Sequence, residues 1–153
     1  AEAEAEREPS CLEIGKALTK NNSSHTDSAT KWCERVDLSL SMRECLVASQ
    51  DMEKCVGQAP LEAAIPGGQT FRAAMLAICS AESASGAAEL DNASKKHPVI
   101  ASWIESHIRH PRASLLMTTL ASYDRAGKGE MLHESARTAG LQECPFAEFI
   151  SAP

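Results

Sequence analysis

The stretch WCERVDLSLSMRECLVASQDMEKCV, residues 32–56, contains three of the six cysteines of this 153-residue chain. On both sides of a turn near residues 38–40, apolar residues and cysteines recur every three or four positions, which is typical of helices with one buried face. Ser41 and Glu44 have the spacing of a capping box and predict where the second helix begins, and Gly57 predicts its end. The stretch therefore predicts an antiparallel helical hairpin whose cysteines lie on the inner face.

The cysteine content predicts three structural disulfides and an oxidising compartment. The number of cysteines is even and no Cys-x-x-Cys spacing occurs, which disfavours a zinc site or thioredoxin-like chemistry. Although the sequence alone permits other pairings, Cys33 and Cys45 each lie six residues from Ser39, so we expect them to face each other across the hairpin. The remaining four cysteines are then expected to form the pairs Cys11–Cys55 and Cys79–Cys144.

The composition predicts an all-α fold. Hydrophobic residues make up 43% of the chain and aromatic residues 4%, so the core must consist mainly of aliphatic side chains that pack between helices. We expect six or seven short helices, arranged as a disulfide-stapled N-terminal helical hairpin and a C-terminal helical bundle. The predicted parts are a flexible acidic tail over 1–9, a disulfide-linked helical unit over 10–57, a linker over 58–69 and a helical bundle over 70–153. The two helical parts are either separate or share one core.

Local signals mark further helix ends. Ser10 and Glu13 form another capping box, which predicts a helix that begins beside the first cysteine. Pro98 predicts the start of a strong helix in the second half, because proline is favoured at the first helical position. A last helix is expected over about 129–139, with Gly140 as its left-handed C-terminal cap.

Charge and hydropathy restrict the possible partners and location. A net charge of −6 without a basic cluster disfavours a nucleic-acid partner. No apolar run is long enough to span a membrane, and no cofactor fingerprint occurs, so no transmembrane segment and no cofactor are predicted. The start AEAEAEREPS is typical of a mature exported chain after removal of a signal peptide, although an expression-vector remnant also fits. We therefore expect a periplasmic or extracellular protein.

The second half also carries the segments FRAAMLAIC at 71–79, HPVIASWIESHI at 97–108 and LHESARTAGLQECPFAEF at 132–149. In these segments the chain resembles small exported bacterial helical proteins that share an IC…W-I…AGL-x-x-CP-[LF]-A pattern. The resemblance covers roughly residues 71–150 and implies an exported, all-helical protein. It implies no activity, because none is assigned to that group.

His107 and His110 are the best candidate metal ligands. Their i, i+3 spacing would place both imidazoles on one side of a helix, beside Trp103. Residues elsewhere in the chain that could complete the site are His133, Glu130 and His97. The competing interpretation is structural, with His107 packed on an apolar stripe and His110 complementing a helix dipole.

Three other patterns indicate chemistry only weakly. The sequence 133–137 resembles the zinc-protease motif His-Glu-x-x-His, but Arg137 occupies the position of the second ligand. Residues 125–129 resemble a phosphate loop superficially and are better explained as a flexible connection between helices. Trp32 and Trp103 could line an apolar ligand cleft between the two halves, although both are better explained as anchors of the core, because the chain has so few aromatic residues.

These observations favour a non-enzymatic exported module that binds a protein partner or a small apolar ligand. The hypothesis depends on the dense cysteines and on the lack of any complete catalytic motif or cofactor fingerprint. A metal-binding protein that uses His107 and His110 is the first alternative. The second alternative is a hydrolase whose site the sequence does not reveal, since a catalytic triad is defined by geometry and not by spacing.

Overall fold

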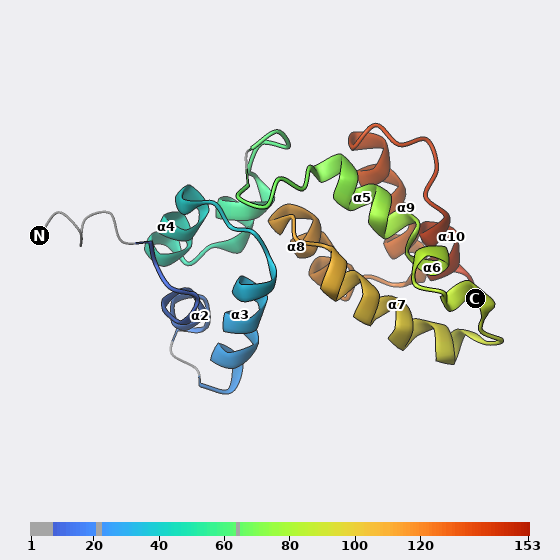
Figure 1. The fold of residues 1–153 in the computed structure, drawn as a ribbon, viewed down its shortest axis with the longest axis horizontal. Coiled ribbons are helices and arrows are strands. Elements are labelled where there is room, and N and C mark those ends of the chain that lie inside the picture. The colour runs from blue at the N-terminus through green and yellow to red at the C-terminus, as the bar shows by residue number, and fades with distance from the viewer. Residues whose placement is uncertain (1–7, 21–22, 64) are drawn as a thin grey trace, which may run out of the picture. The chain divides into compact units, whose positions relative to one another are not determined.

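A computed structural model describes residues 8–20, 23–63 and 65–153 of the chain (Figure 1). Every regular element in this part of the chain is a helix, which confirms the predicted all-α fold. The chain divides into two compact units, Ala1–Gly68 and Gln69–Pro153, each of which is described by itself below.

The N-terminal unit is formed by short helices around an aliphatic core. Its described elements are α2 (Cys11–Thr19), α3 (Ser23–Arg35), α4 (Leu40–Ser49) and the π-helical turn η1 (Glu53–Gly57). Apart from cysteines, the buried apolar side chains are Ile14, Trp32, Val36, Leu38, Met42, Leu46, Val56 and Ile65. The core therefore draws on every element and on the segment after η1, which belongs to this unit and not to a separate linker.

Serine side chains cap α2 and α4. Ser10 starts α2 as predicted, because its Oγ accepts the Glu13 backbone N–H at 3.1 Å. In α4, however, Ser39 is the cap, and its Oγ accepts the Met42 N–H at 3.2 Å. The predicted start at Ser41 is wrong because Ser39 has the extended backbone of an N-cap, whereas Ser41 already lies inside the helix.

The helical hairpin of this unit is formed by α2 and α3, and the predicted hairpin of α3 and α4 is wrong. Gly15 of α2 packs closely against α3, where a Cβ atom would collide with Thr30 Oγ1. A disulfide joins Cys11, the first residue of α2, to Cys33 near the end of α3, so the two helices run antiparallel. The glycine thus allows the close packing that brings these two cysteines together.

The predicted long helix through residues 41–56 is interrupted after Ser49. Gln50 adopts a left-handed backbone with φ 60°, and the chain resumes as η1. This break allows Cys45 and Cys55 to form a disulfide with their Cα atoms 5.7 Å apart. In a continuous helix, ten residues would separate them by about 15 Å along the axis, too far for the bond.

The disulfide pairing corrects two predictions and confirms the third. The expected pairs Cys33–Cys45 and Cys11–Cys55 are wrong, since the structure pairs Cys11 with Cys33 and Cys45 with Cys55. The reason is that α2 occupies the position against α3 that the prediction gave to α4. In the second unit, the expected pair Cys79–Cys144 is present.

Arg43 of α4 holds the chain just before α2. Its Nη1 donates to the Pro9 carbonyl oxygen at 2.8 Å, and its Nε forms an ion pair with Glu8 Oε1 at 3.1 Å. The last two residues of the predicted tail over 1–9 are therefore bound to the N-terminal unit. Residues 1–7 of that tail lie outside the described residues.

The C-terminal unit is a bundle in which α5 contacts α6, α7, α8, α9 and α10. Its described elements are α5 (Phe71–Cys79), α6 (Ala81–Ala84), the 3₁₀ turn η2 (Ala87–Glu89), α7 (Ala93–His107), α8 (Pro111–Leu120), α9 (Arg125–Thr138) and α10 (Pro145–Ser151). The Cys79–Cys144 disulfide connects the end of α5 to the residue that precedes α10.

Two helices of this unit begin earlier than predicted, while one cap is confirmed. Asn92 caps α7 by accepting the Lys95 N–H at 3.0 Å, so Pro98 lies inside the helix and not at its start. The helix α9 begins at Arg125, after the cap Asp124. Gly140 is left-handed with φ 83°, and its N–H donates to the Arg137 carbonyl, as predicted for a C-terminal cap.

Candidate functional site

The N-terminal unit contains an open pocket of about 500 Å³ beside the Cys45–Cys55 disulfide. Three parts of the chain form it: the first two turns of α4 with its cap, the turn η1, and the residues that follow η1. Its lining residues are Ser39, Ser41, Met42, Cys45, Lys54, Cys55, Gln58, Ala59, Pro60 and Ala63. The volume lies within the range of known small-molecule sites, about 300–1,000 Å³.

The pocket owes its shape to the interruption after α4. Asp51 Oδ1 accepts the Lys54 backbone N–H at 3.1 Å and so caps the turn that carries Cys55. The disulfide then fixes this turn against α4. Because the turn folds back, Lys54 and Gln58 line the same pocket as the serines that start α4.

The lining combines an apolar wall with hydrogen-bonding groups. Met42, Pro60 and the alanines supply apolar surface, whereas two serines, Gln58 and Lys54 supply hydroxyl, amide and ammonium groups. Lys54 is exposed, and its ammonium forms no ion pair with any described acidic group. The pocket therefore offers one uncompensated positive charge beside apolar surface.

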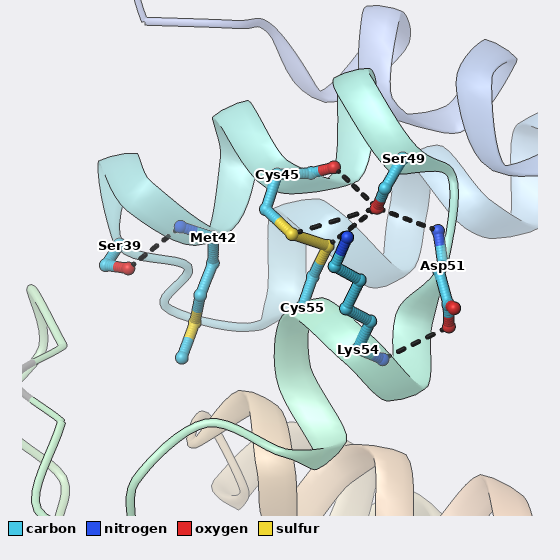
Figure 2. Close-up of a disulfide and its surroundings, with 7 residues drawn as sticks. All are labelled: Ser39, Met42, Cys45, Ser49, Asp51, Lys54 and Cys55. Atoms are coloured by element: carbon cyan, nitrogen blue, oxygen red, sulfur yellow. Dashed lines mark hydrogen bonds between the residues drawn. A yellow bond between two sulfur atoms is a disulfide. The ribbon is translucent and has the colours of Figure 1, made fainter.

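Figure 2 shows Cys45 on α4 and Cys55 on η1 joined by the disulfide, with the Ser49 hydroxyl beside it. Ser49 Oγ lies 2.9 Å from the Cys45 carbonyl oxygen, 3.1 Å from Cys55 Sγ and 3.7 Å from Cys45 Sγ. It also accepts the Asp51 backbone N–H at 3.3 Å. The hydroxyl thus ties the end of α4, the disulfide and the cap of η1 together.

The two histidines of the predicted metal pair lie in different environments. His107 is the last residue of α7 and is exposed; its Nδ1 lies 2.8 Å from the Trp103 carbonyl oxygen, and its ring stacks on Trp103 with centroids 4.2 Å apart. His110 precedes α8 and is buried, with only 2% of its surface exposed. The helix ends between them, so the i, i+3 argument does not apply.

The other predicted metal ligands do not join this pair. His133 Nε2 lies 3.1 Å from Glu148 of α10, and Glu130 is exposed. His97 packs against Phe149, with ring centroids 5.1 Å apart. Within the described ranges, no group of three or more His, Cys, Asp or Glu side chains is placed to hold a metal ion.

His110 is an unusual buried group. Among the described residues, neither ring nitrogen has a hydrogen-bond partner, and the ring contacts Phe71 edge-on with centroids 5.6 Å apart. Burial and, secondarily, the nearby Arg112 guanidinium lower the pKa of His110. Its backbone N–H donates to Gln69 Oε1 at 2.8 Å, so Gln69 anchors the main chain at this residue.

The remaining sequence candidates have structural roles in the described chain. Trp32 is 8% exposed in the core of the N-terminal unit, whereas Trp103 is half-buried in the C-terminal unit. Residues 125–129 are the first turns of α9 and not a flexible loop, because Asp124 accepts the Gly127 N–H at 2.7 Å. Arg137 also lies on α9, near its C-terminal end.

The pocket residues were not predicted as a site. Asp51 is the signal that could have indicated them, since aspartate favours helix caps and Lys54 follows three positions later.

No described helix is long and apolar enough to cross a membrane. Comparison with protein-family models, curated proteins and solved structures finds no match to this chain.

Proposed function

We propose that the protein is a non-enzymatic, exported binding module, and that the pocket beside Cys45–Cys55 is its ligand site. The observation that carries the proposal is the pocket itself, which has the volume of a small-molecule site and a mixed apolar and polar lining. All six cysteines are paired in disulfides, which supports function in an oxidising compartment outside the cytosol.

The lining favours a small amphipathic acid as the ligand. An alkyl or similarly apolar body would contact Met42, Pro60 and Ala63, while a carboxylate would approach the Lys54 ammonium and the serine hydroxyls. Such a ligand exchanges its contact with water for apolar contact at one end and charge-assisted hydrogen bonds at the other. A purely apolar ligand would gain nothing from the ammonium, which would stay hydrated.

A protein partner is less well supported by the described surface. The exposed large apolar side chains are distributed over several elements of both units: Leu12, Leu40, Val47, Leu76, Val99 and Tyr123. Singly exposed apolar residues are normal on protein surfaces. The pocket therefore supports the small-molecule proposal more directly.

The test is an NMR titration of the ¹⁵N-labelled full chain with hexanoate, with 1-hexanol as the uncharged probe. We expect saturable shifts of the amides that line the pocket. Replacing Lys54 with Gln should weaken hexanoate binding about two- to five-fold, as for an exposed ion pair, and leave 1-hexanol binding unchanged. The matched control is Lys31→Gln, which removes an exposed lysine of the same unit that pairs with Asp27 at 3.0 Å.

A second variant fills the pocket. Ala63→Phe places a ring among the lining residues and should abolish binding of both probes while the protein stays folded. If hexanoate shifts no lining amide, or if Lys31→Gln weakens binding as much as Lys54→Gln, the proposed site is wrong.

A further inference from the structure

The Cys45–Cys55 disulfide differs from the disulfide of the C-terminal unit in its exposure. Cys79 and Cys144 are each only 2% exposed, so a reagent reaches their sulfur atoms only when the bundle opens. Cys45, in contrast, is half-buried, although Cys55 is only 6% exposed, and both cysteines line an open pocket. A small molecule in that pocket would contact the disulfide in the folded protein.

The disulfide between Cys11 and Cys33 provides a second comparison. Cys33 is 1% exposed and Cys11 is half-buried, so this bond is partly accessible too. Among the described residues, however, no hydroxyl group forms a hydrogen bond with either of its sulfur atoms. Cys45–Cys55 combines partial exposure, a pocket and a neighbouring hydroxyl donor.

The Ser49 hydroxyl is placed to stabilise a thiolate at Cys55. Neither sulfur of a disulfide carries a proton, so in the 3.1 Å contact between Ser49 Oγ and Cys55 Sγ the hydroxyl must be the donor. Its single proton is shared with the Cys45 carbonyl oxygen at 2.9 Å. A thiolate accepts hydrogen bonds more strongly than a disulfide sulfur, so bond cleavage would move this proton toward Cys55.

Lys54 supplies positive charge to the same place. It lines the pocket together with both cysteines, and Figure 2 labels it on the turn that carries Cys55. A nearby ammonium and a hydrogen-bond donor both lower the pKa of a thiol, and a lower pKa makes it a better leaving group in exchange. The exposed ammonium would also attract an anionic thiol from solution.

We propose that Cys45–Cys55 is a thiol–disulfide exchange site for a small thiol that carries a carboxylate. The thiolate of this molecule attacks the sulfur of Cys45, the more exposed of the two residues, forms a mixed disulfide there, and displaces Cys55 as a thiolate. The thiolate of a second small molecule then attacks the sulfur that the first one contributed to the mixed disulfide. This step releases Cys45 as a thiolate. The products are two cysteine thiols and the disulfide of the small thiol, which has supplied both electrons. This activity goes beyond ligand binding.

The test treats the native full chain with 3-mercaptopropionate for timed intervals, followed by acid quenching, alkylation and peptide mass spectrometry. We expect Cys45 and Cys55 to become labelled before the other four cysteines, about tenfold faster or more. The trapped mixed disulfide should lie on Cys45, with Cys55 as the alkylated free thiol. If Cys11–Cys33 opens first, if all three disulfides open together, or if the mixed disulfide lies on Cys55, the proposal is wrong.

Replacing Ser49 with Ala separates exchange chemistry from local unfolding. The substitution removes hydrogen bonds that hold η1 against α4, so a bond that opens only by unfolding would be reduced faster. The proposal predicts the opposite, an exchange about two- to tenfold slower, because the leaving thiolate loses its donor. Ser28→Ala is the matched control, since Ser28 is an exposed serine of α3 in the same unit and does not line the pocket; it should leave the rate unchanged.

Lys54→Gln tests the electrostatic part. It should slow exchange with 3-mercaptopropionate about two- to fivefold and slow exchange with neutral 2-mercaptoethanol by a smaller factor. The difference between the two thiols should decrease as the salt concentration rises. An unchanged rate for both thiols would contradict the assigned role of Lys54 and the preference for an anionic thiol. Exchange can still succeed if hexanoate fails to bind, so the two proposals are tested independently.

Discussion

Removal of the Cys79–Cys144 disulfide should cost the C-terminal unit more stability than any other disulfide costs its own unit. This bond closes a loop with a sequence separation of 65, against 22 for Cys11–Cys33 and 10 for Cys45–Cys55. The chain-entropy relation converts these separations into about 4.3, 3.4 and 2.7 kcal/mol at 25 °C. A double alanine variant also loses packing contacts, because Cys79 and Cys144 are both buried.

The assay is urea denaturation followed by tryptophan fluorescence. Each unit contains one tryptophan, so a Trp32→Phe background reports on the C-terminal unit through Trp103 alone. The double variant Cys79→Ala, Cys144→Ala is compared with the same background that keeps the disulfide. A loss below about 2 kcal/mol would refute the loop-closure reasoning. A loss smaller than that caused by removing Cys11–Cys33, measured through Trp32 in a Trp103→Phe background, would refute it as well.

Two further predictions concern His110 and Gly15. Because burial lowers the pKa of His110, the unfolded chain takes up a proton below about pH 6.5 that the folded unit resists, so the free energy of unfolding should fall as the pH drops from 7 to 5. His110→Phe should reduce this loss, as measured by Trp103 fluorescence at each pH; an identical pH dependence in both proteins would contradict the assignment. Gly15→Val should destabilise the N-terminal unit by about 1–3 kcal/mol, because the new side chain meets Thr30 of α3. Trp32 fluorescence measures the loss, and the exposed substitution Lys16→Val on the same helix should cost clearly less.

Local rules predicted helix caps where a single strong signal was present. Ser10 and Gly140 perform the expected roles because each depends only on the backbone within one turn. Where two neighbouring residues could each start a helix, the predicted start was wrong. Ser39 and Ser41 both resemble caps, and Asn92 starts α7 ahead of Pro98. Pro98 is tolerated beyond the first turn of α7 because only one backbone carbonyl loses its hydrogen-bond donor. Tertiary packing can offset that cost.

Disulfide pairing was predictable only where it did not depend on which helices are neighbours. Cys79–Cys144 does not depend on the pairing in the first unit, because these are the only cysteines of the second unit. In the first unit, the choice depended on whether α2 or α4 packs against α3. The deciding residue is Gly15, which appears in the sequence as a weakness of α2 but in the structure permits its close contact with α3.

The failed metal site and the missed pocket have the same physical cause, which is that helical periodicity does not reveal where a helix ends. The spacing of His107 and His110 suggests one helical face, but α7 ends at the first and α8 begins after the second. The apolar stripe through Cys45 and Cys55 likewise continues in register across Gln50, although the backbone reverses there. That reversal brings the two cysteines together and opens the pocket beside them. One local break in the helix thus produces both the covalent tie and the accessible site, so any function assigned to the pocket depends on the disulfide that forms its wall.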